Sequence, residues 1–414
     1  MFKKITYNFI FFTFFFILGI FVLEQYFKYV HNKELKKRDI YKNLEVSPLT
    51  YHPTIGWVFK KNFDYEIPIL NNQVINKTTN NLGLASDYDI FIDEKKFNIF
   101  VLGDSFSEAL GVDTQDSWPN LLKNNLIKMY NENIELYNLS VAGYNLDQYY
   151  FRLKEFLDLV KPDLLILGLS TATDFYDVGY FNNSFVYGKT IGRNYLEIKN
   201  NILSENTQFK NIENLNIGFG YTPFAKSERQ FVNNKIIKKN NHKFDILDFI
   251  KYQLGNFIIP HTYAKIKRSK VMIWFASKSN LFGISLWPGI ETAMMIKKNH
   301  LKDSKVLLVK EILNKINNYS KTKKIPFYVV HIPYQIEVDE NLWNSTYNKS
   351  KIFSNREPED KIKKIAEEIK LNVIYTRDIF IKKSKSKSLY IENDGHLNIY
   401  GNFLMKDIVL NKIN

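Results

Sequence analysis

From residue 97 onward, short apolar segments alternate with amphipathic ones, and this alternation is the strongest constraint on the fold. Continuous apolar strands separated by helices are typical of a parallel sheet with helices on both faces, which is a three-layer α/β/α architecture. Right-handed crossovers then bring the carboxyl ends of all strands to one edge, where open α/β folds bind ligands. The strands are predicted over 99–102, 134–139, 164–169, 326–331 and 373–375, and the helices over 118–129, 146–160, 306–319, 357–369 and 399–413.

Shifts in composition divide the chain into further segments. Residues 1–24 are predicted to be an N-terminal transmembrane signal anchor, 25–49 a stalk or linker, 50–96 a lead-in of strands and turns, and 97–414 the α/β domain. The alternation stops over residues 176–303, which are therefore predicted to be a large insertion after the third strand of the sheet. This insertion could cover the site as a lid or substrate platform, or it could only decorate the surface.

The N-terminal segment has the composition of a membrane span. No charged residue lies between Lys4 and Glu24, and about 20 apolar residues are enough to cross a bilayer as a helix. No small-residue cleavage site follows, which favours an uncleaved anchor over a signal peptide. We expect a single pass through the inner membrane, with the α/β domain in the periplasm. The positive-inside rule argues against that orientation, because the span is followed by Lys28, Lys33, Lys36, Lys37 and Arg38.

Composition also excludes several classes of function. The chain has no cysteine, so it has no disulfide, no thiolate zinc site and no cysteine nucleophile. Its net charge of +14 comes from scattered lysines rather than a basic cluster with stacking aromatics, and we expect no nucleic-acid partner. A basic surface could favour anionic lipid head groups or acidic glycans. No metal-ligand cluster or phosphate-binding glycine loop is evident, so we expect neither metal nor cofactor, and no protein partner is indicated.

The first predicted strand of the sheet runs into the turn Gly103-Asp104-Ser105. A serine between a buried strand and a helix presents its hydroxyl at the carboxyl edge of the sheet, beside amides that can hold an anion. The same residue types are common in ordinary turns, so the tripeptide alone leaves both a nucleophile and a plain turn open. A nucleophilic serine needs a base and an orienting carboxylate. Of the seven histidines, His396 follows Asp394 by two positions, where the carboxylate can orient the imidazole.

Together these segments resemble the SGNH hydrolase superfamily, also called GDSL esterases, and its bacterial membrane-anchored subset. The matching blocks are Gly103-Asp104-Ser105-Phe106-Ser107 with Ser117-Trp118-Pro119, then Asn138-Leu139-Ser140-Val141-Ala142-Gly143-Tyr144, and finally Asp394-Gly395-His396-Leu397-Asn398. The resemblance covers about residues 50–414 and implies a flavodoxin-like three-layer fold.

The resemblance implies a role for each site residue. Ser105 would be the nucleophile, His396 the general base and Asp394 the carboxylate that orients it. The backbone amides of Ser105 and Gly143 would form the oxyanion hole. Asp104 would support the geometry of the turn rather than take part in the chemistry.

One block departs from the family pattern. Thr173 stands where the family has an asparagine, whose side-chain amide would serve the oxyanion hole. Either Thr173 substitutes in part, or Asn145 reaches in, or activity is reduced, because loss of one oxyanion donor typically costs about a hundredfold in rate. The neighbouring Asp174 is better explained as a helix cap. We expect Glu108 to be a solvated helix residue rather than one that faces the pocket. We expect His331 to be a core histidine that is satisfied by hydrogen bonds.

The sequence therefore predicts a serine esterase or O-acyltransferase that uses an acyl-serine intermediate. The expected partners are the lipid bilayer and an acylated glycan of the cell envelope, for example an acetylated one, or a small ester. The alternative is a catalytically weak or inactive SGNH-like scaffold that binds glycan or an envelope partner, a hypothesis motivated by Thr173. A third hypothesis is a lipase-like enzyme that uses the aromatic insertion near the bilayer.

Overall fold

The computed structural model describes residues 2–37, 48–68, 74–130, 133–170, 174–175, 178–179, 194–206, 303–347, 354–391 and 394–414. The chain divides into two compact units, with helix α1 in one and all other described elements in the second. Thr173, the predicted stalk from residue 38 onward and most of the predicted insertion lie outside the described residues.

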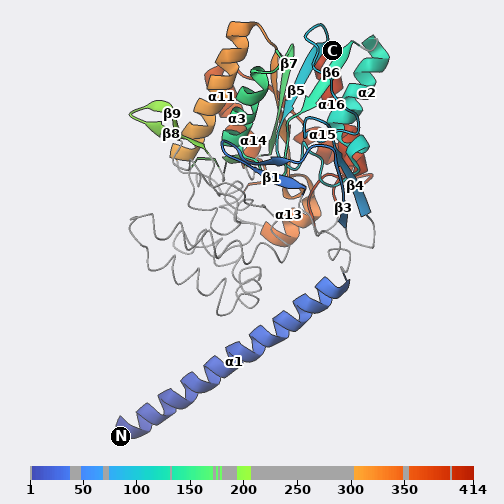
Figure 1. The fold of residues 1–414 in the computed structure, drawn as a ribbon. Helices are drawn as coiled ribbons and strands as arrows, with labels where there is room; N and C mark the ends of the chain where they lie inside the picture. Colours follow the sequence, from blue (N-terminus) through green and yellow to red (C-terminus); the bar gives the residue numbers. More distant parts are fainter. Residues whose placement is uncertain are drawn as a thin grey trace. The chain divides into compact units, whose positions relative to one another are not determined.

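A five-stranded parallel sheet forms the centre of the second unit (Figure 1). Its strands are β5 (Phe97–Leu102), β6 (Ile134–Asn138), β7 (Leu164–Ser170), β10 (Phe327–Ile332) and β11 (Asn372–Tyr375). They lie in the order β11-β10-β7-β5-β6, and every neighbouring pair is parallel. This is the flavodoxin-like order 2-1-3-4-5, whose topological switch point falls between β5 and β7. The predicted fold class is confirmed, and the strand bounds are close to the predicted ranges.

Helices cover both faces of this sheet. One hydrophobic core includes residues of α3 (Leu146–Leu157), α11 (Asp303–Lys323) and α14 (Glu357–Ile369). The other includes residues of α2 (Trp118–Tyr130), α15 (Arg377–Ser384) and α16 (Ile399–Ile413). Strand β5 serves both cores, because Phe100 and Leu102 face the first and Ile99 and Val101 face the second. Two short helices, α12 (Gln335–Val338) and α13 (Glu340–Tyr347), follow β10.

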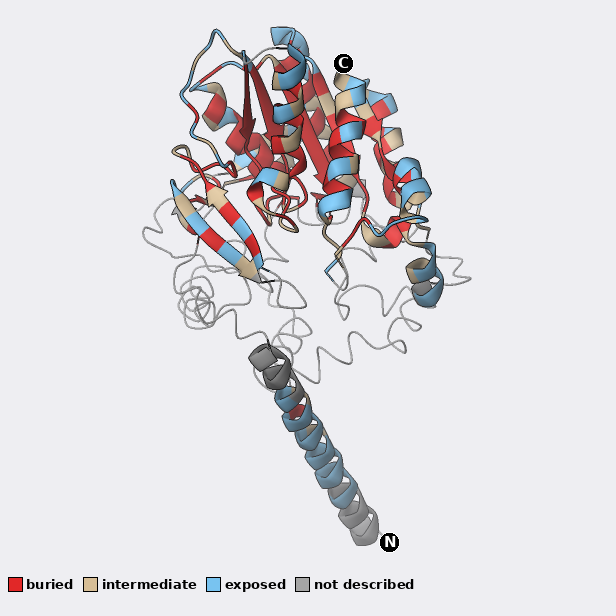
Figure 2. Cartoon of the chain, turned by 90° about the vertical axis from the view of Figure 1, so that its right-hand side faces the viewer, coloured by how far each residue is buried: buried red, intermediate tan, exposed pale blue. Residues whose placement is uncertain are grey.

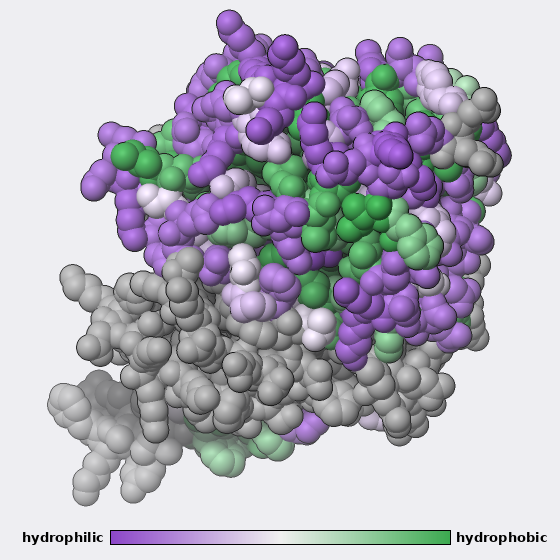
Figure 3. Space-filling model, turned by 45° about the horizontal axis from the view of Figure 1, so that its top comes forward, coloured by the Kyte–Doolittle hydropathy of each residue, from purple (hydrophilic) through white to green (hydrophobic). Residues whose placement is uncertain are grey.

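Burial follows this layering. The sheet is almost entirely buried, whereas the helices are exposed on their outer sides (Figure 2). On the face seen in Figure 3, hydrophilic residues cover most of the described surface, with apolar residues between them. The second unit therefore has the polar exterior and apolar interior of a globular domain.

The lead-in folds as two antiparallel hairpins. One pairs β1 (Leu49–His52) with β2 (Gly56–Phe59), and the other pairs β3 (Phe63–Pro68) with β4 (Val74–Thr79). Trp57 and Tyr65 belong to the same hydrophobic core as α3 and α11. The two hairpins thus contribute to the core of the α/β domain.

Part of the predicted insertion is described. It includes the antiparallel hairpin of β8 (Tyr195–Lys199) and β9 (Ile202–Asn206). Asp147, at the start of α3, accepts hydrogen bonds from the backbone N–H groups of Gly179 (2.8 Å) and Leu196 (3.0 Å). These bonds attach the hairpin to the domain, while a lid function for the insertion stays a prediction.

Helix α1 (Phe2–Lys37) is 36 residues long. Its segment Phe11–Tyr29 has a mean hydropathy of 1.5 and is only 6% buried. By length and composition this segment can cross a membrane, as an anchor or as a signal sequence.

Candidate active site

Ser105 follows β5 directly, in a turn that Asp104 stabilises. The Asp104 Oδ1 accepts a hydrogen bond from the Phe106 N–H (2.9 Å), and the Asp104 carbonyl accepts one from the Ser107 N–H (3.1 Å). At the end of β6, the Asn138 side-chain amide donates to the Ser107 carbonyl (3.2 Å). The turn is therefore fixed both from within and from the neighbouring strand.

His396 lies in a tight loop immediately before α16. The Ile391 N–H donates to the His396 carbonyl (2.8 Å), and the Asp394 Oδ1 accepts from the His396 N–H (3.1 Å) in an Asx turn. Gly395 between them has φ +89°, a conformation that glycine adopts without strain. Asn398 caps α16 with its side chain and so fixes the chain just after the histidine.

The structure brings Ser105, His396 and Asp394 into one hydrogen-bonded line. His396 Nε2 lies 2.8 Å from Ser105 Oγ, although 291 positions separate the two residues in the chain. On the other side of the ring, His396 Nδ1 lies 2.5 Å from Asp394 Oδ1. The imidazole also packs against the ring of Phe106, with 4.9 Å between centroids. A nucleophile bonded to a base, with the base bonded to a carboxylate, is the arrangement that activates a serine.

The surroundings of His396 raise its pKa above the ordinary value. Burial favours the neutral ring and lowers the pKa, but the hydrogen bond and the charge of Asp394 outweigh this effect, and the charges of Asp104 and Glu108 add to it. A raised pKa makes His396 a better proton acceptor than an ordinary histidine.

Two backbone amides near Ser105 are available for an oxyanion. Gly143 lies in the loop between β6 and α3 with φ +79°. Within the described part of the chain, the N–H groups of Ser105 and Gly143 donate to no hydrogen-bond acceptor. Amides that are free before the reaction suit an oxyanion hole, because they can bind the developing charge. Thr173, the third predicted contributor, lies outside the described residues.

Asn145 has a structural role that the sequence analysis did not assign. Its side-chain oxygen accepts from the N–H groups of Asp147 (3.1 Å) and Gln148 (3.4 Å), and the Gln148 side chain accepts from the Asn145 N–H (3.2 Å). This is a capping box at the start of α3. Asp174, expected to cap a helix, accepts from the Ser170 N–H (2.7 Å) at the end of β7.

Glu108 differs from the expectation of a solvated helix residue. Its side chain is fully buried, and its Oε2 accepts from the Ala142 N–H at 2.5 Å, next to Gly143. Tyr65 and Lys77 of the lead-in also lie at Glu108. These partners come from three distant segments of the chain, so no local sequence pattern marks the contact.

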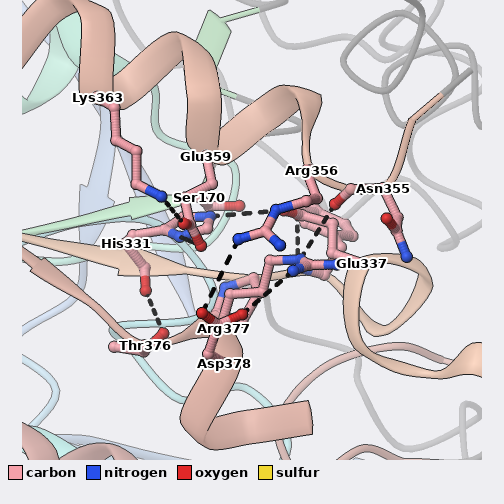
Figure 4. A network of polar contacts seen from close by, with 12 residues as sticks. Ser170, His331, Glu337, Asn355, Arg356, Glu359, Lys363, Thr376, Arg377 and Asp378 are labelled. Carbon is pink, nitrogen blue, oxygen red and sulfur yellow. Dashed lines mark hydrogen bonds and ion pairs between the residues drawn. The ribbon is translucent and has the colours of Figure 1, made fainter.

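His331 is a core histidine and lies in a separate cluster of polar side chains (Figure 4), but it is not satisfied by hydrogen bonds as the sequence suggests. Its Nε2 lies 3.5 Å from Glu337 Oε2, and its Nδ1 lies 3.8 Å from Glu359 Oε2. Neither ring nitrogen makes a hydrogen bond with a described residue. Lys363 pairs with Glu359, and Arg377 donates to a backbone carbonyl at the edge of the cluster. Two carboxylates therefore lie close to this histidine without a hydrogen bond to its ring.

Among the described residues, no group of three or more histidine, aspartate or glutamate side chains is placed to hold a metal ion. Strand order and site together define the class, which is a parallel α/β protein with a serine–histidine–aspartate triad at the carboxyl edge of its sheet. The fold is the one that the SGNH resemblance implies, and the catalytic roles of Ser105, His396 and Asp394 stay a prediction.

Neither a family model nor a curated protein matches the sequence. Among solved structures, the chain is similar to TesA, with 11% identity over 77% of this chain and 98% of that chain and a TM-score of 0.36. It is also similar to a catalytic mutant of Axe2, an acetylxylan esterase from Geobacillus stearothermophilus, with 11% identity, coverages of 78% and 97% and a TM-score of 0.35. A member of the lipolytic G-D-S-L family from Veillonella parvula shows 10% identity, coverages of 76% and 96% and a TM-score of 0.32.

Proposed function

We propose that the chain is a serine ester hydrolase that works through an acyl-serine intermediate. The observation that carries this proposal is the hydrogen-bonded line from Ser105 through His396 to Asp394 at the edge of the sheet. The backbone amides of Ser105 and Gly143 are consistent with it, because neither donates to an acceptor among the described residues.

In the first half-reaction, Ser105 Oγ attacks the ester carbonyl carbon while its proton moves to His396 Nε2. The carbonyl electron pair moves onto oxygen, and the N–H groups of Ser105 and Gly143 bind the resulting oxyanion. When the tetrahedral intermediate collapses, the bond to the alcohol oxygen breaks and the alcohol takes the proton back from His396. Asp394 keeps the imidazole in the required tautomer throughout. The product of these steps is an acyl ester on Ser105.

In the second half-reaction, His396 removes a proton from the acceptor, which attacks the acyl-serine. With water as the acceptor, the products are a carboxylic acid and free Ser105. With a sugar hydroxyl as the acceptor, the acyl group is transferred, and the enzyme is an O-acyltransferase.

For the substrate we propose a short acyl ester, such as acetyl, on a glycan of the cell envelope. Two features support this proposal. The apolar segment Phe11–Tyr29 can anchor the chain in a membrane, and the net charge of +14 suits an anionic polymer or lipid surface. Within this proposal the anchor crosses the inner membrane once, and the α/β domain lies in the periplasm.

The test is hydrolysis of p-nitrophenyl acetate by the full chain and by Ser105→Ala. We expect the substitution to lower kcat by about 10⁴-fold or more, because the triad acts as a unit. A fluorophosphonate probe should label the native chain and the Ser107→Ala control, but not Ser105→Ala. Unchanged turnover in Ser105→Ala would overturn the proposal. A native chain with neither turnover nor labelling would favour the binding scaffold.

A further inference from the structure

Two groups from outside the triad hold the peptide between Ala142 and Gly143 and the peptide that precedes it. The Glu108 Oε2 accepts from the Ala142 N–H at 2.5 Å, and the Trp57 Nε1–H donates to the Ala142 carbonyl at 3.3 Å. A trans peptide is planar, so the Ala142 C=O and the Gly143 N–H point in opposite directions. By holding this carbonyl, Trp57 fixes the direction in which the Gly143 N–H points.

Trp57 is itself firmly placed. Its side chain is 4% exposed, and it packs against the ring of Tyr144, with 5.8 Å between centroids. The Tyr144 hydroxyl donates to the Trp57 carbonyl at 2.6 Å. Strand β2 is thus bonded to the loop after β6 in two places, one on each side of Gly143.

Glu108 is fully buried, where a carboxylate without partners would be costly. Burial raises its pKa, while the nearby charge of Lys77 and the hydrogen bond from Ala142 lower it. Tyr65 also donates its hydroxyl to the Glu108 Oε1, at 3.4 Å. The partners that compensate the buried charge thus come from the lead-in and from the loop that carries Gly143.

Lys77 reinforces this arrangement from β4. Its buried ammonium donates to the carbonyls of Ala109 (2.7 Å) and Glu108 (3.2 Å), and burial lowers its pKa to about 8. Ala109 has φ +60°, an uncommon conformation for a residue with a side chain. The lead-in therefore stabilises a strained segment just after Ser105, and that segment carries the carboxylate that binds Ala142.

We propose that Trp57 and Glu108 are positioning residues for the oxyanion hole. Trp57 holds the Ala142–Gly143 peptide and Glu108 holds the peptide before it, so that the Gly143 N–H points at the developing oxyanion before substrate binds. Neither side chain touches the substrate. The inference rests on the proposed serine hydrolase function. A donor that is oriented in advance costs no reorganisation during the reaction, which is why such donors contribute strongly to catalysis.

The test uses the full chain with Trp57→Phe, which removes the indole N–H and keeps an aromatic ring. We expect kcat for p-nitrophenyl acetate to fall about 10- to 100-fold, because the Gly143 amide loses its fixed direction. KM should change by no more than about twofold, since the amide acts mainly in the transition state. Phenylboronic acid forms a tetrahedral adduct with a serine, and its inhibition constant should rise by the factor by which kcat/KM falls.

The matched control is Tyr88→Phe, which removes a part-buried hydrogen bond of the same length to a backbone carbonyl, from the Tyr88 hydroxyl to Leu136 on β6 (3.3 Å). It should lower the urea midpoint about as much as Trp57→Phe does and leave kcat unchanged. A second pair is Glu108→Ala and Glu108→Gln. Glutamine keeps an acceptor for the Ala142 N–H, so we expect it to recover part of the kcat that alanine loses.

The same measurements distinguish failure of the positioning role from failure of the hydrolase proposal. If the native chain has no turnover that depends on Ser105, the hydrolase proposal fails. If it has such turnover, but Trp57→Phe keeps the native kcat and the native boronate inhibition constant, the positioning role is overturned and the hydrolase proposal stands. Equal losses of kcat in Trp57→Phe and Tyr88→Phe would also overturn it, because the effect would then be one of stability alone.

Discussion

Gly168 and Ser107 are packed so closely that a Cβ atom on Gly168 would lie 2.1 Å from the Ser107 Oγ. Gly168 lies within the fully buried strand β7, where a glycine normally weakens a strand. Gly103 also leaves space for the Ser107 hydroxyl, because a Cβ atom on Gly103 would lie 2.3 Å from the Ser107 Oγ. The turn that carries Ser105 therefore packs closely against β5 and β7, the two strands that flank the switch point of the sheet.

We expect Gly168→Ala to lower the free energy of unfolding by about 1–3 kcal/mol, because it overpacks this contact. Ser107→Ala alone should be nearly neutral, since the buried Ser107 Oγ has no hydrogen-bond partner among the described residues. In the double variant the added Cβ lies 3.4 Å from the Ser107 Cβ and 2.9 Å from the Ile332 Cδ1, the end of a flexible side chain that can shift, so part of the stability should return. Urea unfolding of the four proteins measures this coupling, and additive effects would contradict it.

The activity should fall on the acidic side of neutrality as His396 becomes protonated. Its raised pKa places the acidic limb of kcat/KM above pH 6.5, the ordinary value for histidine. Asp394→Asn removes the charge that raises this pKa, so the limb should move to lower pH. The same substitution should reduce kcat by about 10⁴-fold, because the required tautomer is lost.

The measurement is a pH profile of p-nitrophenyl acetate hydrolysis for both proteins. Asp407→Asn provides a control, because this surface carboxylate on α16 pairs with Lys406 and not with the site. A limb that stays in place in Asp394→Asn would show that Asp394 does not set the pKa of His396.

Asn145→Ala should cost about 1 kcal/mol of stability, through loss of the cap of α3. Asn145→Ser keeps a capping oxygen and should unfold close to the native midpoint in urea. The kinetics of Asn145→Ser then separate the two roles considered for this residue. Native kcat in this variant indicates a cap only, whereas a lower kcat at native stability would show that the amide also serves the oxyanion.

The full chain should sediment with membranes and resist extraction with alkaline carbonate, because of the apolar segment Phe11–Tyr29. Leu18→Lys places a charge near the middle of this segment, where it costs about 2.5–3.5 kcal/mol, and it should shift protein to the soluble fraction. Leu18→Ala is the control and should stay with the membranes. Equal partitioning of the two variants would contradict the anchor.

Orientation is tested separately with a reporter fused after Asn414. Periplasmic activity of the reporter is the expected result. Cytoplasmic activity would agree with the flanking positive charges and would remove the cell-envelope glycan from the list of substrates.

The sheet could be predicted because its strands are continuous apolar runs, which directly reflect burial on both faces. The Asp394–His396 pair could be predicted because both residues lie in one short loop. Ser105 could be predicted because it lies in the turn that follows a strand. The cap at Asn145 was missed even though Gln148, three positions later, completes a local capping-box signal.

The contacts that hold the loop with Ala142 and Gly143 could not be predicted from local patterns. Trp57 and Ala142 are 85 positions apart, and Glu108 and Ala142 are 34 apart, so neither contact has a periodicity or a motif. Glu108 looks like a surface residue in the sequence because no partner for its charge lies close to it along the chain. Only the packing of the lead-in against the domain brings Lys77 and Tyr65 to it.

The separation of Ser105 from His396 has a consequence for biosynthesis. During translation the serine emerges 291 residues before its base, and the loop that holds the base depends on the capped helix α16 that follows it. A nascent chain that already contains a folded β5 and its turn still lacks the group that deprotonates the serine. On the proposed mechanism, ester cleavage therefore begins only after helix α16 has folded and His396 has reached Ser105.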